Sequence, residues 1–214
     1  MGKNGINLTD IKVNVGDDVV KTADGVKIQL LDELGFMTKT FTYHHKDSTK
    51  GYTTDGWYLG NKNIKVGDAN DYFFTAGDGF WFGGKKEYSI TTSGEVLRQS
   101  LPVDLIDGNK MIANPYPVAI NLSEITVDVG DDVVKTADGV KIQILDELGF
   151  MVKTYTYHHK DTTKGYTTDG WYLGNKIIKA TNDVTFAPGQ AMWFGGKLGY
   201  KVILPAPKLL NSAE

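Results

Sequence analysis

The sequence predicts an all-β protein built from two tandem homologous domains, each a β-sandwich or a barrel-like sheet. Two observations carry this prediction: a long internal repeat, and short segments of alternating apolar and polar residues that turn signals separate. The composition agrees, because 25 glycines and an aromatic content of 11% favour turns and strands over long helices.

The internal repeat defines the domain organisation. Residues 7–62 and 121–176 are identical at 48 of 56 positions, and after a more divergent stretch residues 74–85 match residues 186–197. This period is longer than that of the common solenoid repeats, and two copies are too few for a stacked array. We therefore expect one domain at 1–100 and a second at 101–214, with 101–120 serving as its linker or first strand.

Alternating hydrophobicity predicts the strands of the first copy in order. The second copy repeats the same pattern, and the only helical segments expected are single turns near residues 30–34 and 103–106. The expected strands cover residues 11–15, 26–30, 38–44, 52–59 with a turn inside it, two segments between 71 and 82, and 88–92.

The two copies differ in what precedes them. Residues 109–120 are expected to form a strand and then a corner that Pro115 and Pro117 make rigid. Since Met1 aligns with Pro115, the first copy has no counterpart of this strand within the sequence. We therefore predict an open sheet edge in the first domain, which a strand from another subunit could fill. The alternative is a domain that does not need the extra strand.

Two short motifs resemble a pattern in secreted or cell-surface β-repeat proteins of environmental bacteria. These are Asn114–Pro117 (Asn-Pro-Tyr-Pro) and the segment from Ala187 to Phe194, which is similar to a Pro-Gly-Gln-Gly-Phe-Trp motif. In those proteins the first motif opens a domain as a corner and the second closes it as a hairpin. The resemblance implies an extracellular or cell-surface location and a non-enzymatic role, and it assigns no functional residues.

Charge and composition argue against several classes of function. The net charge is −3 with both signs interspersed, so there is no basic block for a nucleic acid backbone. No apolar run is long enough to span a bilayer. The sequence has no cysteine, which excludes disulfides, thiolate metal sites and a cysteine nucleophile.

Metal binding is not expected from the histidines. His44 and His45 are adjacent, and their copies are His158 and His159, so in a strand each pair points to opposite faces. Calcium binding remains an alternative, because acidic loops such as Asp17-Asp18 could supply oxygen ligands. Ordinary turn chemistry explains those loops equally well, and we expect no cofactor.

An aromatic segment that is identical in the two copies supplies the candidate ligand-binding residues. Adjacent Trp and Tyr residues in a strand face opposite ways, so we expect one in the core and the other exposed beside Asp, which is the chemistry of sugar binding. The alternative is that these aromatics fill the core. The candidates are Tyr52, Asp55, Trp57 and Tyr58 in the first copy and Tyr166, Asp169, Trp171 and Tyr172 in the second.

The functional prediction follows from these features. The sequence contains no nucleophile elbow, zinc-protease helix, phosphate loop or dinucleotide fingerprint, so we do not expect an enzyme and assign no catalytic residue. We expect a structural, self-associating protein, such as a filament component, that is extracellular or at the cell surface and associates by strand addition between subunits. The alternative is a carbohydrate-binding module with two equivalent aromatic sites on a polysaccharide.

Overall fold

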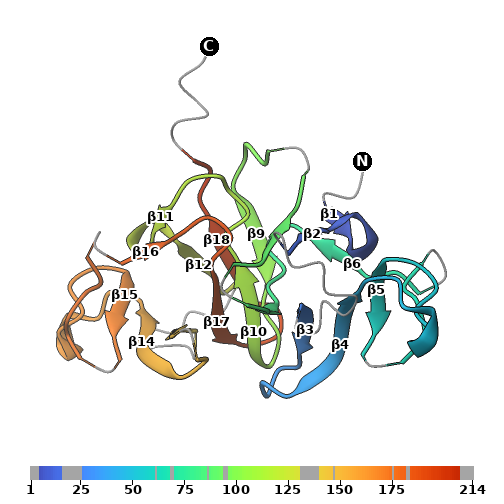
Figure 1. Ribbon diagram of the computed structural model, residues 1–214. Helices are drawn as coiled ribbons and strands as arrows, with labels where there is room; N and C mark the ends of the chain where they lie inside the picture. Colours follow the sequence, from blue (N-terminus) through green and yellow to red (C-terminus); the bar gives the residue numbers. More distant parts are fainter. Residues whose placement is uncertain are drawn as a thin grey trace, which may run out of the picture. The chain divides into compact units, whose positions relative to one another are not determined.

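The computed structural model describes most of the chain and confirms the all-β class (Figure 1). Regular structure in the described residues consists of strands and four single 3-10 turns. The described residues are 5–15, 26–60, 62–67, 70–85, 87–93, 96–130, 140–146, 148–174, 176–181 and 184–207.

The chain divides into two compact units. The first comprises Met1–Asp32 and Phe36–Glu95, and the second comprises Glu33–Gly35 and Val96–Glu214. Each unit has its own cluster of buried apolar side chains. We therefore describe each unit by itself.

The described residues of the first unit form eight strands in three small antiparallel sheets. The largest sheet has the order β5-β4-β3-β7, and the two others are the pairs β1-β6 and β2-β8. The strands are β1 (Gly5–Asn7), β2 (Lys12–Asn14), β3 (Lys27–Leu31), β4 (Met37–His44), β5 (Gly56–Leu59), β6 (Phe73–Thr75), β7 (Trp81–Gly83) and β8 (Ser89–Thr91).

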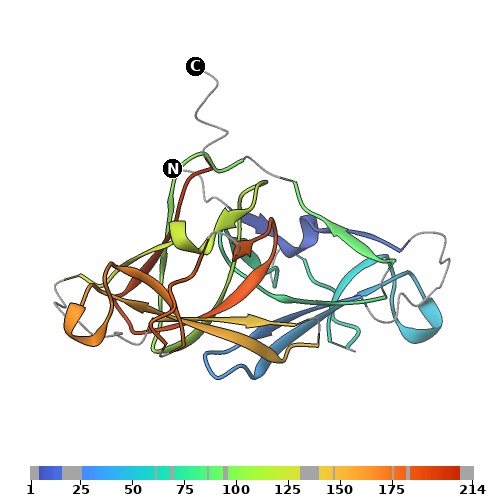
Figure 2. The same ribbon diagram turned by 90° about the vertical axis from the view of Figure 1, so that its left-hand side faces the viewer.

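The second unit repeats this plan and adds two strands. Its sheets have the orders β10-β17-β13-β14-β15, β12-β18-β9 and β11-β16. Figure 2 shows the long strand β14 in yellow and its counterpart β4 in blue. The strands are β9 (Leu101–Asp104), β10 (Gly108–Ala113), β11 (Ile120–Asn121), β12 (Thr126–Asp128), β13 (Lys141–Leu145), β14 (Met151–His158), β15 (Gly170–Leu173), β16 (Thr185–Phe186), β17 (Ala191–Gly196) and β18 (Lys201–Leu204).

The strands form where the sequence alternates. In β3 the apolar residues Ile28 and Leu30 are buried while their neighbours are only half-buried, which is the pattern of a sheet with one face on the core. β4 is rich in threonine and aromatic residues, which pack well on a pleated surface. It pairs with β3 from Lys27↔Thr42 onward, with a bulge between Leu30 and Leu31.

The 3-10 turns lie elsewhere than the sequence suggested. The predicted turns near residues 30–34 and 103–106 are wrong, because Leu30 belongs to β3 and Val103 pairs with β18 through Val202. The observed turn η2 (Ser48–Lys50) begins at Asp47, whose carboxylate accepts a hydrogen bond from the Thr49 amide at 3.1 Å. The remaining turns are η1 (Leu8–Asp10), η3 (Leu122–Glu124) and η4 (Thr162–Lys164).

The resemblance implied that the glycine-containing turn after β16 closes a hairpin, and this expectation is wrong. Gly189 takes a φ of 71° in this turn, but β16 pairs with β11 while β17 pairs with β10 and β13. The first unit has the same arrangement, since β6 pairs with β1 and β7 pairs with β3. The turn therefore carries the chain from one sheet to another.

The corner after β10 is held by side-chain hydrogen bonds. Asn114 is buried, and its side-chain amide donates to the backbone oxygens of Phe186 at 2.7 Å and Val118 at 3.0 Å. The Tyr116 hydroxyl lies 2.8 Å from the carbonyl oxygen of Gln99. Burial raises the pKa of Tyr116, so its hydroxyl stays protonated and can donate.

Candidate functional site

The tryptophans of the candidate aromatic segment lie in the cores of the two units. Trp57 is 3% exposed, and its indole N–H donates to the backbone oxygen of Ile11 at 3.2 Å. Trp171 is 1% exposed and donates to Ile125 at 2.8 Å. These hydrogen bonds tie β5 to the segment after η1, and β15 to the segment after η3.

The prediction that one member of the Trp57–Tyr58 pair is exposed is wrong, and both side chains are buried as the alternative had it. Tyr58 is 1% exposed, because a second aromatic cluster covers the opposite face of the sheet from Trp57. In this cluster, the ring of His44 stacks on Tyr52 at a centroid distance of 3.8 Å, and Tyr58 meets both rings edge-on. We call His44, Tyr52 and Tyr58 the aromatic cluster of the first unit. Both faces of β5 are therefore covered.

The second unit repeats the aromatic cluster with His158, Tyr166 and Tyr172. His158 stacks on Tyr166 at 3.8 Å, and Tyr172 is 2% exposed. Burial, with a smaller effect of Lys164, lowers the pKa of His158. The imidazole is therefore held in its neutral form, which suits stacking between apolar ring faces.

The aspartate of the candidate set fixes a turn. Asp55 Oδ1 accepts a hydrogen bond from the backbone N–H of Lys46 at 2.7 Å, and its other oxygen lies 3.5 Å from His45 Nδ1. The Lys46 amide, followed by His45, lowers the pKa of Asp55. The copy makes the same bond, from Lys160 to Asp169 at 2.6 Å. This carboxylate links the end of β4 to the start of β5.

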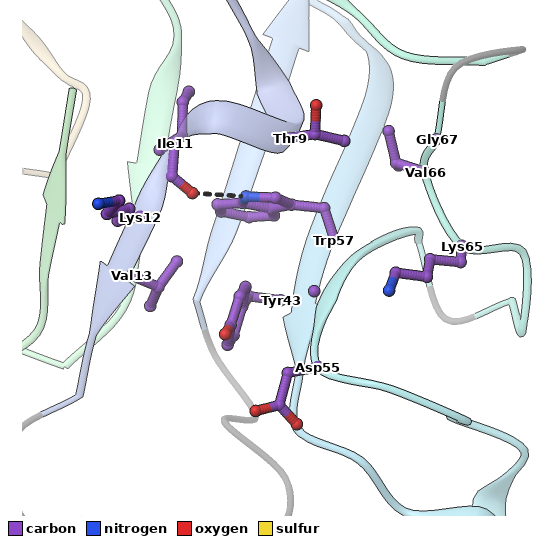
Figure 3. Close-up of a pocket in the computed structure, with 11 residues that line it drawn as sticks. Thr9, Ile11, Lys12, Val13, Tyr43, Asp55, Trp57, Lys65, Val66 and Gly67 are labelled. Carbon is purple, nitrogen blue, oxygen red and sulfur yellow. Dashed lines mark hydrogen bonds between the residues drawn. The ribbon is translucent and has the colours of Figure 1, made fainter. Parts of the chain in front are cut away.

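A pocket of about 730 Å³ opens beside Trp57 in the first unit. Figure 3 shows the Trp57 ring in its wall, with Tyr43 below it and Asp55 beyond Tyr43. Burial, and then the nearby Asp55 charge, raise the pKa of Tyr43. The residues that line the pocket are Thr9, Ile11, Lys12, Val13, Tyr43, Asp55, Gly56, Trp57, Lys65, Val66 and Gly67.

Only part of this pocket was predicted from the sequence. Trp57 and Asp55 were among the candidates, whereas Tyr43, Lys65 and Thr9, which lie elsewhere along the chain, were not. No sequence spacing joins residues so far apart along the chain. Tyr52 and Tyr58, which were also candidates, belong to the aromatic cluster and do not line the pocket.

Within the described ranges, no three His, Asp or Glu side chains come together in a way that could hold a metal ion. The acidic loop at Asp17-Asp18, on which the calcium prediction rested, lies outside the described residues.

A second structural result concerns membranes: the described part of the chain contains no helix with the length and apolar character to cross a bilayer.

The clearest difference between the units is the edge of each sheet. In the second unit β10 pairs with β17 from Gly108↔Gly196 to Ala113↔Ala191, and β9 pairs with β18. Among the described residues of the first unit, β7 pairs only with β3 and β8 pairs only with β2. We call the unpaired sides of β7 and β8 the open edge.

Comparisons with protein families, with curated proteins and with solved structures find no match to this chain. The open edge and the Trp57 pocket are therefore the two structural features that bear on function.

Proposed function

We propose that this protein is a non-catalytic structural component of an extracellular or cell-surface assembly, whose subunits associate by strand addition at the open edge. The finer architecture belongs to the same proposal: two tandem homologous domains, sandwich-like or barrel-like, of which the first receives a strand. The motifs that resemble those of secreted β-repeat proteins support the location.

The observation that carries the proposal is that β7 pairs on one side only among the described residues, whereas its counterpart β17 pairs with β10 and with β13. A strand edge presents a row of backbone donors and acceptors, and an extended segment of another chain can satisfy them by adding a strand. The described part of the first unit does not shield this edge with a strand of its own. The edge strand β7 also carries Trp81 and Phe82, which would add apolar contacts to such pairing.

The non-catalytic part of the proposal rests on the sequence and on the placement of the polar residues. The sequence lacks the motifs of the common hydrolases and nucleotide-binding enzymes. The most promising carboxylate, Asp55, is engaged with the Lys46 amide and His45.

Sedimentation of the purified chain over a wide concentration range tests the assembly proposal. We expect oligomers that grow with concentration and that electron microscopy shows as ordered particles or fibres. Strand pairing depends on backbone hydrogen bonds, so assembly should persist at about 1 M salt, where exposed ion pairs are screened. Monomers at every concentration would contradict self-association.

A carbohydrate-binding role is the second candidate, and the Trp57 pocket favours it. Tyr43 offers an aromatic surface, while Asp55, Lys65 and Thr9 supply polar groups of the kind that bind sugar hydroxyls. Titration with soluble polysaccharides tests this role. Binding should be lost in Tyr43→Ala and retained in the matched variant Tyr157→Ala if the pocket of the first unit is the site. An unchanged titration of Tyr43→Ala would rule the pocket out.

A further inference from the structure

The two units contain the same short sequence in strands that have different neighbours. Trp81–Gly83 continues into Gly84 with the sequence Trp-Phe-Gly-Gly, which recurs at residues 193–196. In the second unit these residues lie between β13 and β10. In the first unit β7 is three residues long, whereas β17 is six residues long. Among the described residues, the shorter strand has a partner on one side only.

Burial follows the pairing. Trp193 is 8% exposed and Phe194 is fully buried, whereas their counterparts Trp81 and Phe82 are only half-buried. The same holds for β18 and β8, because Val202 is fully buried and Ile90 is half-buried. The first unit therefore exposes apolar surface at the place where the second unit has β9 and β10.

One glycine position has different neighbours in the two units. A Cβ atom on Gly196 would collide with the side chain of Leu105, which follows β9 and packs against that backbone. The matching Gly84, which follows β7, has no colliding neighbour among the described residues, since a Cβ atom there would meet Tyr88 and Phe82 no closer than 3.6 Å. Gly84 also has an ordinary backbone conformation, so a methyl group fits there at normal van der Waals distances.

The segment from β9 to β10 shows which chemistry fills this space, with its two strands in different sheets: β9 pairs with β18 and β10 pairs with β17. It contributes Val103, Leu105 and Ile112, which are 7%, 1% and 0% exposed. These residues join the core cluster that contains Phe194 and Val202. The segment therefore supplies both backbone pairing and buried apolar side chains to the second unit.

We propose that the open edge binds a two-strand segment with the β9–β10 sequence pattern, carried by a further copy of this repeat. This inference rests on the strand-addition part of the proposed function, not on self-association of identical chains, and it names the segment that is added. The equivalent register places Lys110 opposite Phe82, and Met111 opposite Trp81, with Val103 opposite Ile90. β7 then lengthens through Gly79 and Gly84 to match β17.

The β9–β10 segment of an identical chain is not the donor in this proposal. If β9 and β10 of one molecule moved to the open edge of another, the donor would uncover its own β17 and β18. The number of unpaired edges would stay the same, and the loss of freedom on association would oppose the exchange. A donor must therefore carry such a segment that is not already paired.

A synthetic peptide of residues 99–117 tests the inference with the full chain. We expect saturable binding by calorimetry, a blue shift of tryptophan fluorescence as Trp81 becomes buried, and slower amide exchange at residues 79–84 and 89–91. A peptide with Ile112→Asp is the matched control, since a charge at this buried position should abolish binding.

Gly84→Ala is the decisive variant of the chain. It should leave thermal unfolding unchanged but weaken peptide binding by roughly ten- to a hundredfold, because its methyl group takes the place of the Leu105 side chain. Equal binding to Gly84→Ala, or no binding of the peptide to the parent chain, would overturn the inference.

The outcomes separate this inference from the assembly proposal. A chain that stays monomeric alone but binds the peptide supports the inference and contradicts self-association. A chain that assembles without binding the peptide, or whose assembly exposes the amides of β10, supports association by another route and overturns the inference.

Discussion

The side chain of Leu105 occupies the space that a Cβ atom on Gly196 would need, with the Leu105 Cβ atom 3.0 Å from that position. The backbone of β17 and the residue that follows β9 are thus in direct contact, and glycine is required for it. The matching Gly84 has no equivalent contact among the described residues, although the sequence around it is the same.

This contact predicts that one glycine-to-alanine substitution affects stability much more in the second unit than in the first. Gly196→Ala should destabilise the second unit by about 1–3 kcal/mol, because the added methyl group overpacks a filled core. Gly84→Ala should change stability by less than about 0.5 kcal/mol. Calorimetric unfolding of both variants measures the difference. Equal destabilisation would mean that the space beside Gly84 is already filled.

The indole of Trp171 should contribute more than its volume to stability. Trp171→Phe leaves the Ile125 carbonyl oxygen without its 2.8 Å donor and removes buried ring atoms, so we expect a loss of about 2–4 kcal/mol in urea unfolding. Trp81→Phe is the control, since Trp81 is half-buried at the open edge, and its loss should be smaller. Equal losses would contradict the core assignment of Trp171.

His158 should make the stability of the second unit depend on pH. Its pKa is lowered in the folded state by burial, so the unfolded chain takes up the proton first as the pH falls below 6.5. The free energy of unfolding therefore has its full value above pH 6.5 and decreases below it, until the pH passes the folded pKa. His158→Phe should remove this part of the dependence. Parallel pH profiles for parent and variant would contradict a neutral, stacked His158.

The turn bond of Asp55 predicts a modest effect. Asp55→Ala removes the acceptor of the Lys46 amide, and since the site is exposed we expect a loss of about 0.5–1.5 kcal/mol. The matched change Asp169→Ala should have a similar effect on the second unit. A much larger loss in one copy would show that its carboxylate has a further role.

Local sequence patterns predicted the strands well where one face of a sheet meets the core. Alternation placed β3 and β4 within a residue or two, since Ile28 and Leu30 point to the core and their neighbours do not. The open edge was also predictable, because the repeat makes the missing strand visible. The signal for η2 was present but not used: Asp47 is a good N-cap, and Gly51 takes a left-handed conformation at the end of the turn.

The candidate site was harder to predict because it depends on long-range packing. Alternation says that Trp57 and Tyr58 face opposite ways, but it does not say that His44 and Tyr52 cover the second face. In the same way, the register between β4 and β5 brings Tyr43 opposite Trp57, and no local pattern predicts that pairing. Comparing the two copies of a repeat can therefore predict the edges and corners of small sheets, but it does not predict which side chains come together in a pocket.

Hydrogen exchange of the dilute, monomeric chain tests the central claim most directly. Backbone amides of Trp193, Phe194 and Gly195 lie between two strands, whereas those of β7 have a strand on one side only among the described residues. We predict that exchange in β7 and β8 is markedly faster than in β17 and β18, and that the peptide of residues 99–117 removes the difference. Equal protection of β7 and β17 in the free monomer would contradict the account.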